Sequence, residues 1–145
     1  MLNLLIKNAT EKDVDAVINL CVPPKMKVTE SFIRGSNEKR KWALKMLELY
    51  GEFAKIACID SNVVGLLQYI PKPEENIVEI TCIFVPDKSY ERKGIARKLL
   101  ITFLEDLKKG VHWLDGKVPD GVIVWAFEVP GYYPPVSYTH LRAHE

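Results

Sequence analysis

The chain places four cations and one glycine in a stretch of eight residues, ERKGIARK at positions 91–98. The stretch follows an apolar, partly β-branched run, residues 77–85, and leads into residues 94–109, whose apolar side chains recur at helical spacing. Four cations at the start of a helix oppose the helix dipole, so this arrangement is unfavourable unless an anion lies there. The free N–H groups of a helix start, beside a glycine, would let a phosphate approach the backbone closely. The stretch therefore predicts an anion-binding turn between a strand and a helix.

The composition indicates that this anion is small. The 145 residues are 48% hydrophobic and 27% charged, which suits one globular domain, and the formal net charge is only +1. Such a charge provides no global field that would favour nucleic acid or an anionic membrane. The three cysteines lie among apolar neighbours without a CxxC or Cys/His spacing, so we expect reduced thiols and no metal site. The sequence shows neither a signal-peptide pattern nor an apolar run of membrane-spanning length, and we expect a soluble cytoplasmic protein.

Periodicity and turn residues predict a mixed α/β order along the chain. The expected elements are a strand at 2–6, a helix from Thr10 to Pro23, a loop or broken helix at 25–36, a helix at 37–50, strands at 54–59, 63–70 and 77–85, a helix at 94–109 and a strand at 122–127. Thr10 and Asp13 form a capping-box pattern, residues 60–62 have hairpin-turn chemistry, and Gly65 is typical of a β-bulge. A helix connects the last two strands, which predicts a parallel pair beside an otherwise antiparallel sheet.

Strict alternation along the strand at 77–85 predicts two different faces. One face is entirely apolar and comprises Val78, Ile80, Cys82 and Phe84. The other face comprises Ile77, Glu79, Thr81, Ile83 and Val85. Glu79 is therefore expected on the same side of the sheet as Ile83 and Val85.

The C-terminal residues 135–145 have neither helical nor strand periodicity, and they contain two of the three histidines. They resemble a tail that recurs at the ends of unrelated translated sequences. We interpret them as vector- or adapter-derived, with a native disordered terminus as the alternative. One domain is thus expected at 1–134, incomplete at its C-terminus.

The order of elements, together with Ile83-Phe84-Val85-Pro86 and the turn that follows, resembles the GNAT (Gcn5-related) N-acetyltransferase superfamily over about residues 2–134. The pattern of that family is Arg or Gln, two residues, Gly, one residue, then Gly or Ala. Gly94 and Ala96 meet the last two positions, whereas Glu91 stands where Arg or Gln is usual. The resemblance implies the acyl-CoA N-acyltransferase fold: a mixed, mostly antiparallel sheet with a splayed parallel pair and helices on both faces. The final helix and hairpin of that fold would be missing from this chain.

The resemblance also implies an activity and a binding site. The activity is transfer of an acetyl group from acetyl-CoA to an amine of a small molecule or a protein, by direct attack and without a metal. The pantetheine arm would pair with the end of the strand at 77–85 like an added strand, and the pyrophosphate would lie on the turn. The cofactor-binding residues are then Ile83, Phe84, Val85, Glu91, Arg92, Lys93, Gly94, Ile95, Ala96 and Arg97. The amine would approach from the far side of the sheet, past residues 25–36.

The catalytic base implied by the resemblance is Glu79, because some members of the family carry a glutamate base on the equivalent strand. The alternative is a glutamate on a half-solvated strand face, without a catalytic role. The usual acid of the family is a tyrosine on a helix after the strand at 122–127, and we expect that helix in the missing C-terminal region.

Two other functions are considered. The first is a CoA-binding sensor or regulatory module of the same fold without transfer activity, which the substitution at Glu91 would permit. The second is a nucleotide-phosphate binder, which is disfavoured because the sequence contains neither GxxxxGK[ST] nor GxGxxG. The acyl acceptor and the oligomeric state, including a homodimer, are left open.

Overall fold

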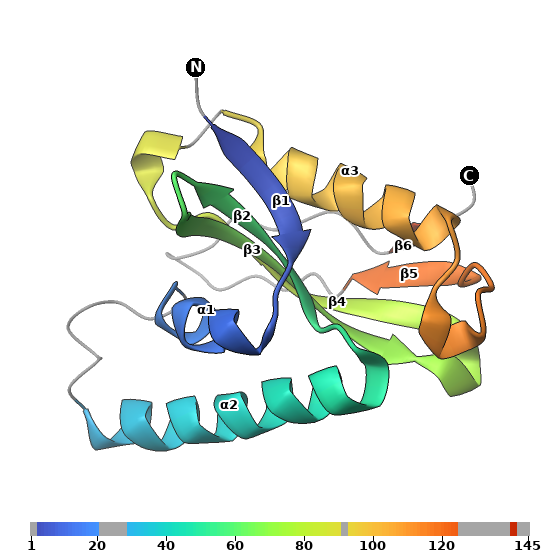
Figure 1. Ribbon diagram of the computed structural model, residues 1–145, viewed down its shortest axis with the longest axis horizontal. Helices are drawn as coiled ribbons and strands as arrows, with labels where there is room; N and C mark the ends of the chain where they lie inside the picture. The colour runs from blue at the N-terminus through green and yellow to red at the C-terminus, as the bar shows by residue number, and fades with distance from the viewer. Residues whose placement is uncertain (1–2, 21–28, 91–92, 125–139, 142–145) are drawn as a thin grey trace.

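A six-stranded sheet in the order β1-β2-β3-β4-β5-β6 runs through the molecule (Figure 1). The computed structural model describes residues 3–20, 29–90, 93–124 and 140–141. The strands are β1 (Leu4–Asn8), β2 (Ala54–Ile59), β3 (Asn62–Lys72), β4 (Ile77–Phe84), β5 (Gly121–Val124) and β6 (His140–Leu141). The helices are α1 (Val14–Leu20), α2 (Glu30–Tyr50) and α3 (Ile95–Lys108), with short 3-10 helices η1 (Glu11–Asp13), η3 (Pro73–Glu75), η4 (Lys88–Tyr90) and η5 (His112–Leu114). Neighbouring strands are antiparallel except β4 and β5, which are parallel, so the predicted mixed sheet is confirmed.

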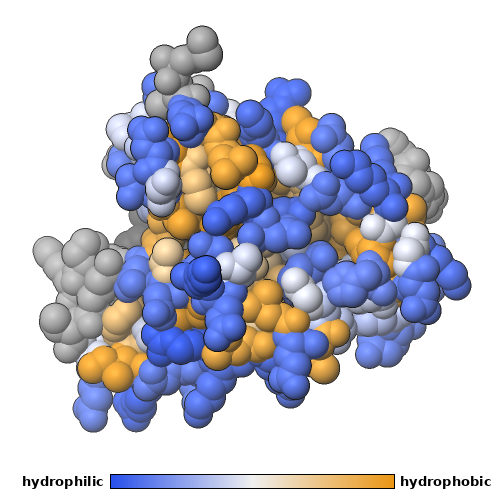
Figure 2. Space-filling model, viewed as in Figure 1, coloured by the Kyte–Doolittle hydropathy of each residue, from blue (hydrophilic) through white to orange (hydrophobic). Residues whose placement is uncertain are grey.

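Helices cover both faces of the sheet. α1 and α2 lie on one side and α3 lies on the other (Figure 1). Each layer has its own set of buried apolar side chains. The α3 cluster includes Leu67, Tyr69, Val78, Ile80, Leu99 and Phe103. The α1/α2 cluster includes Val17, Ala43, Phe53, Ile56 and Leu66. On the surface, Figure 2 shows apolar patches broken up by polar side chains, which is ordinary for a folded domain.

The two N-terminal helices begin at side-chain caps. Thr10 and Asp13 form the predicted capping box, in which the Thr10 N–H donates to the Asp13 carboxylate at 2.8 Å. The hydroxyl oxygen of Thr29 accepts the Phe32 N–H at 3.1 Å, and α2 therefore starts at Glu30. The prediction of a loop or broken helix at 25–36 is wrong over 30–36, where the helix is continuous, because the Thr29 cap starts it and no proline interrupts it before Gly51. Residues 25–28 lie outside the described residues.

The hairpin between β2 and β3 follows the predicted turn chemistry. Asp60 and Ser61 both have positive φ, 50° and 70°, as the two central residues of a type I′ turn require. The predicted bulge is also present: Ala57 pairs with Gly65 and Cys58 pairs with Val63, which leaves Val64 as the extra residue of β3.

A second bulge, which the sequence did not predict, lies in β4. Two successive residues of β3, Gln68 and Tyr69, pair with Cys82 and Ile80, and Thr81 is the extra residue between them. Such a bulge interrupts the ladder and bends the strand locally.

This bulge shifts the alternation of side chains along β4. Ile80 belongs to the α3 cluster, and Ile83 and Val85 pack against the same cluster, whereas Cys82 packs against the α1/α2 cluster. The expectation that Cys82 shares a face with Ile80 is therefore wrong. Glu79, next to Ile80, faces the α1/α2 side, so the expectation that it shares a face with Ile83 and Val85 is also wrong.

At the C-terminal edge, β6 pairs with β5 through Val122↔Leu141 and Ile123↔His140. These two residues of β6 belong to the segment 135–145, whose vector or adapter origin stays a prediction, as does the domain boundary at 134. In the part of the chain that the structure describes, no helix is long and apolar enough to span a bilayer.

Candidate functional site

The last two residues of β4, Ile83 and Phe84, pair with a strand on one side only within the described residues. β4 pairs with β5 from Ile77↔Gly121 to Ile80↔Val124. Beyond Ile80 the strand continues to Phe84, where it pairs with β3 alone. Among the residues that the structure describes, Ile83 and Phe84 thus pair with β3 and with no strand on the side of β5. This is the segment, with Ile83, Phe84 and Val85, where the sequence predicts that pantetheine pairs.

The N-terminus of α3 presents free N–H groups. Its first intrahelical hydrogen bond runs from the Lys98 N–H to the Gly94 carbonyl at 2.9 Å. The N–H groups of Ile95, Ala96 and Arg97 precede that bond, and no helical carbonyl lies one turn before them. Gly94 has φ +74°, and a Cβ built there would meet nothing within 4 Å, so the space beside the backbone is open. The geometry suits an anion that contacts the backbone itself.

The predicted binding residues occupy different positions in this turn. The side chain of Ile95 is buried at 2% exposure and anchors the helix, while Ala96 and Arg97 are exposed. Lys93 is also exposed and precedes the helix. Glu91 and Arg92 lie outside the described residues.

Gly65 of β3 brings the end of β4 and the start of α3 together. A Cβ built at Gly65 would lie 3.2 Å from the Val85 Cγ2 and 3.3 Å from the Ile95 Cγ2. The missing side chain therefore lets Val85 and Ile95 pack over one point of the sheet. This contact holds the end of β4 beside the start of α3.

The loop before the turn is fixed by Asp87. Its carboxylate oxygen accepts the Ser89 N–H at 2.9 Å and the Ser89 hydroxyl at 2.8 Å. The Ser89 backbone and side-chain donors both lower the pKa of Asp87, because they stabilise its ionised form.

Glu79 lies in β4 two residues before the bulge. Its carboxylate is 3.3 Å from the Lys72 Nζ, and its side chain is 16% exposed. The residue opposite it in β3, Ile70, packs against the α1/α2 cluster, which places Glu79 on that face of the sheet. Glu79 and the helix α3 therefore lie on opposite faces of the sheet.

A hydrogen-bonded pair that the sequence reasoning missed lies at the bulge. The Gln68 Nε2 donates to the Thr81 Oγ1 at 3.3 Å, and the Thr81 hydroxyl donates to the Gln68 main-chain carbonyl at 3.2 Å. Gln68 pairs across the sheet with Cys82. A polar residue in an otherwise apolar strand was the available signal, since Gln68 interrupts the run Val63–Ile70.

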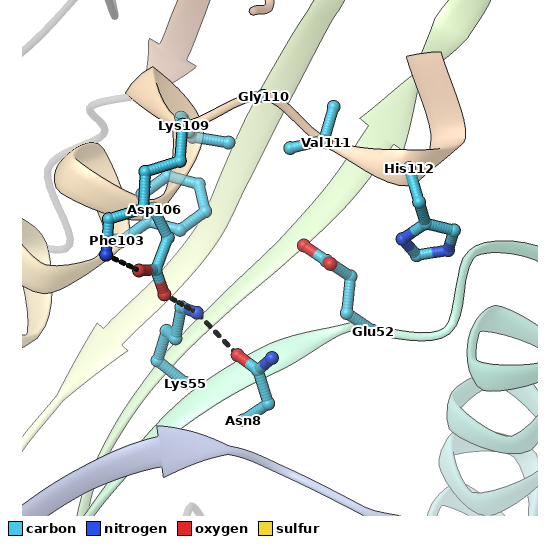
Figure 3. A pocket seen from close by; sticks show the side chains of 10 residues that line it. Asn8, Glu52, Lys55, Phe103, Asp106, Lys109, Gly110, Val111 and His112 are labelled. Carbon is cyan, nitrogen blue, oxygen red and sulfur yellow. Dashed lines mark hydrogen bonds and ion pairs between the residues drawn. The ribbon is translucent and has the colours of Figure 1, made fainter. Parts of the chain in front are cut away.

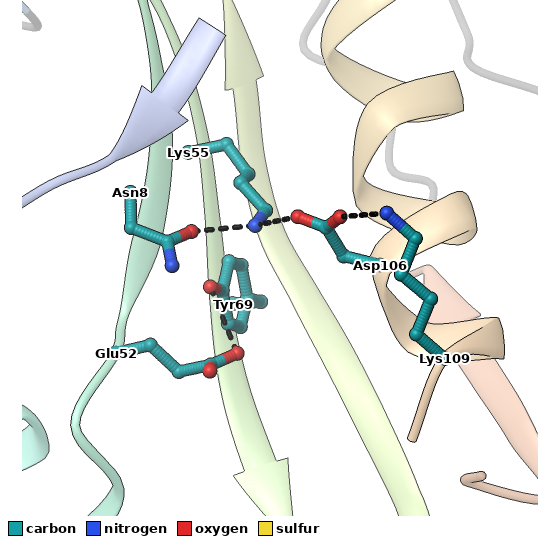
Figure 4. A network of polar contacts seen from close by, with 6 residues as sticks. All are labelled: Asn8, Glu52, Lys55, Tyr69, Asp106 and Lys109. Carbon is teal, nitrogen blue, oxygen red and sulfur yellow. Dashed lines mark hydrogen bonds and ion pairs between the residues drawn. The ribbon is translucent and has the colours of Figure 1, made fainter. Parts of the chain in front are cut away.

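A separate polar cavity lies at the other end of α3. It has a volume of about 230 Å³ and is lined by Asn8, Glu52, Lys55, Phe103, Asp106, Leu107, Lys109, Gly110, Val111 and His112 (Figure 3). Lys55 is 4% exposed, and its ammonium contacts both the Asp106 carboxylate and the Asn8 Oδ1 (Figure 4). These contacts tie β1, β2 and α3 together. Since α3 has 14 residues, this cavity lies roughly 20 Å from the open N-terminus of the helix.

Tyr69 is buried beside this cavity. Its hydroxyl donates to the Glu52 carboxylate at 3.1 Å. Burial raises the pKa of Tyr69 well above its ordinary value, and the negative charge of Glu52 raises it further. Burial likewise raises the pKa of the Cys58 thiol, which suits an unreactive core cysteine.

Metal ligation has no support in the described residues, where no group of three His, Cys, Asp or Glu side chains could hold an ion.

Comparisons with known proteins agree with this geometry. The sequence profile of the acetyltransferase (GNAT) family matches residues 15–122. A comparison with curated protein sequences gives no significant match.

Three solved structures illustrate the likeness of fold. An acetyltransferase candidate from Pyrococcus horikoshii has a TM-score of 0.60 at 18% identity, over 89% of this chain and 40% of its own. Diaminobutyrate acetyltransferase from Paenibacillus lautus, in complex with L-2,4-diaminobutyric acid and coenzyme A, has a TM-score of 0.57 at 13% identity, over 88% of this chain and 67% of its own. The ribosomal-protein-S18-alanine N-acetyltransferase of Escherichia coli has a TM-score of 0.57 at 15% identity, over 89% of this chain and 70% of its own.

The chain thus spans 40% of the length of the Pyrococcus protein. At these identities the structural likeness concerns the fold alone. The family profile, by contrast, covers well over half of the chain, from α1 to β5. The chain belongs to the acetyltransferase (GNAT) family.

Proposed function

We propose that this chain transfers an acetyl group from acetyl-CoA to an amine by direct attack. The observation that carries the proposal is the contact at Gly65, which brings Val85, just after Ile83 and Phe84 of β4, beside the N-terminus of α3. An acyl-CoA needs both features, because its pantetheine arm has amide groups that can pair with a strand and its pyrophosphate is an anion.

In this proposal the ligand crosses the gap between the two features. The pantetheine arm pairs with the backbone of Ile83, Phe84 and Val85. The pyrophosphate accepts hydrogen bonds from the N–H groups at 94–97, with the charges of Lys93 and Arg97 nearby. Arg92 and Glu91 are assigned to the same turn from the sequence pattern.

The chemistry then requires three groups. The amine nitrogen attacks the thioester carbonyl, the carbon–sulfur bond breaks, and the amine proton goes to a base. Glu79 is our choice of base, because some members of the resembled family carry a glutamate base on this strand, and Glu79 is next to Ile80, the last residue that pairs with β5 among the described residues. The bulge at Thr81 takes backbone groups out of the regular ladder at the same point, where an N–H could stabilise the oxyanion. The thiolate of CoA leaves and takes up a proton.

A CoA-binding sensor of the same fold is the second candidate. The carboxylate of Glu91, at a position where the family usually has Arg or Gln, is the observation in its favour. Such a module would bind CoA without turning it over.

Thermal shift with acetyl-CoA, CoA and ATP tests the binding half of the proposal. Acetyl-CoA and CoA should raise the melting temperature, because a ligand that binds only the folded state stabilises it. A larger shift with ATP would contradict the CoA assignment. Thiol release with L-2,4-diaminobutyrate and with peptides that begin with alanine then tests transfer. Binding of CoA with no thiol release from any amine would favour the sensor.

Two glycines provide a matched pair of variants for the anion site. Gly94 and Gly116 both have positive φ, +74° and +84°, and a Cβ at either would meet nothing within 4 Å. Alanine at each should cost about 1 kcal/mol of unfolding free energy through backbone strain alone. Only Gly94→Ala should also weaken CoA binding, measured by isothermal titration calorimetry. Equal CoA affinity in both variants would mean that Gly94 does not contact the ligand.

A further inference from the structure

The side-chain amide oxygen of Gln68 has no hydrogen-bond partner among the described residues of the sheet. The Gln68 side chain lies on the α1/α2 side, since its neighbours two positions away in β3, Leu66 and Ile70, contact the α1/α2 cluster. Its Oε1 atom is buried and has no hydrogen-bond partner in the described part of the structure. A buried acceptor without a donor is costly, so a folded protein rarely keeps one without a use for it.

The orientation of this amide is fixed by Thr81. The Thr81 hydroxyl has one proton, and that proton goes to the Gln68 main-chain carbonyl. The Thr81 oxygen can therefore only accept from the Gln68 side chain, which must turn its NH₂ end toward Thr81. This leaves the Oε1 end as the group that is held in place and unpaired. Thr81 is the bulged residue and follows Ile80, the last residue of β4 that pairs with β5 among the described residues, so the unpaired oxygen is held beside the bulge.

Glu79 is a diagonal neighbour of Gln68 on the same face. Gln68 pairs with Cys82, and Glu79 pairs with Ile70, two residues further along β3. Diagonal positions in adjacent strands lie roughly 8 Å apart, and the side chains of glutamine and glutamate are long enough for one atom between them to contact both.

We propose that the Gln68 Oε1 accepts an N–H of the acyl acceptor, so that Gln68 and Glu79 together select a primary amine. This inference rests on the proposed function. A neutral primary amine has two N–H groups and one lone pair. One N–H donates to the Gln68 Oε1, the other faces Glu79, and the lone pair is left to attack the thioester carbonyl. When the new C–N bond forms, the proton facing Glu79 moves to that carboxylate, and the N–H on Gln68 stays on the product amide.

A secondary amine cannot satisfy both residues. Its neutral form has one N–H, so either Gln68 keeps an unpaired oxygen or Glu79 receives no proton. The inference therefore predicts strong discrimination between a primary amine and its N-methyl derivative, with Gln68 as the residue that provides it.

The test uses Gln68→Met, which keeps the length of the side chain and removes the acceptor. Two probes are compared. The first is L-2,4-diaminobutyrate or a peptide that begins with alanine, whichever the wild type acetylates faster. The second is the N-methyl form of the same amine. We expect Gln68→Met to raise the KM for the primary amine about ten-fold, the value of one hydrogen bond. The preference for the primary over the N-methyl amine should fall by a similar factor. The acetyl-CoA affinity should stay within about two-fold, and the melting temperature should stay the same or rise, because an unsatisfied oxygen has been removed.

Thr81→Val is the second variant, because it removes the hydroxyl that orients the amide. It should reduce the same preference by a smaller factor. Unchanged amine kinetics in Gln68→Met would overturn the assignment. A lower melting temperature together with weaker acetyl-CoA binding would also overturn it, since that result identifies Gln68 as a structural residue. A wild type that binds acetyl-CoA and acetylates neither probe would instead contradict the proposed function, and the assignment of Gln68 would fall with it.

Discussion

The ion pair between Lys55 and Asp106 provides the sharpest test of how the chain holds its site. Lys55 is the one charged residue in the buried set of the described structure, with its side chain 6% exposed, whereas the Asp106 side chain is 43% exposed. Replacing Asp106 with asparagine keeps the shape and removes the charge. The Lys55 ammonium would then remain buried with only amide oxygens, from Asn8 and the new side chain, as acceptors.

The expected cost follows from the exposure of the two partners. Removing one member of a fully buried ion pair costs about 3–5 kcal/mol, because the other charge is left without compensation. Asp106 is partly exposed, so water can reach the ammonium more easily once the carboxylate is gone. We therefore expect Asp106→Asn to lower the free energy of unfolding by about 2–3 kcal/mol. For a domain of ordinary stability this loss is a large fraction of the total free energy of unfolding.

Urea denaturation monitored by circular dichroism measures this difference. The pair Glu38–Lys41 is the control, since its side chains are 77% and 76% exposed at an N–O distance of 3.7 Å. Glu38→Gln should change the unfolding free energy by less than about 0.5 kcal/mol. The double variant Lys55→Met, Asp106→Leu should be more stable than Asp106→Asn alone, because it leaves no unpaired charge. Equal losses for Asp106→Asn and Glu38→Gln would refute the reasoning.

Three further predictions concern single residues. The pKa of Tyr69 is raised in the folded state, so the wild type should lose stability as the pH rises above about 10, where tyrosine ionises in the unfolded chain. Tyr69→Phe removes that contribution, and the stability difference between the two proteins, from urea titrations at pH 8 to 11, should shrink with rising pH. Glu79→Gln should lower the acetylation rate at neutral pH and leave acetyl-CoA binding intact; an unchanged rate would remove Glu79 from the base role. Gly65→Ala should weaken CoA binding in calorimetry, because its Cβ would press on Val85 and Ile95 at 3.2–3.3 Å; unchanged affinity would show that the packing adapts.

The sequence predicts those parts of the fold whose causes are local. The hairpin turn at 60–62, the capping box of Thr10 and Asp13 and the C-terminal glycine of α2 each follow from the backbone or side-chain chemistry of a few neighbouring residues. The parallel pair follows from a strand, helix and strand in succession, which also depends only on order along the chain. The start of α3 after Gly94 was predictable for the same reason, since the glycine and the first helical residues are adjacent in sequence, whereas anion binding there stays a prediction.

The bulge at Thr81 could not be predicted because its cause is not local. Nothing in the run 77–85 departs from strand alternation, and the register is set by β3, where the adjacent residues Gln68 and Tyr69 pair with residues two positions apart in β4. The error in the face of Glu79 follows directly from this, because one extra residue moves every later side chain to the other side. The Lys55–Asp106 contact was missed for a similar reason: its partners are 51 positions apart in the sequence.

The two ends of α3 are fixed to the sheet by different interactions, and together they would hold the proposed anion site in place before a ligand arrives. At the N-terminus, Val85 and Ile95 pack over Gly65, a contact that depends on shape alone. At the other end, Asp106 meets the buried Lys55, a contact that depends on charge. A helix anchored at one end could pivot, and its free N–H groups would then have to be ordered by the pyrophosphate at a cost in affinity. Anchored at both ends, the helix keeps those N–H groups beside the end of β4, so in the proposed complex the anion would bind without a further cost for placing the helix.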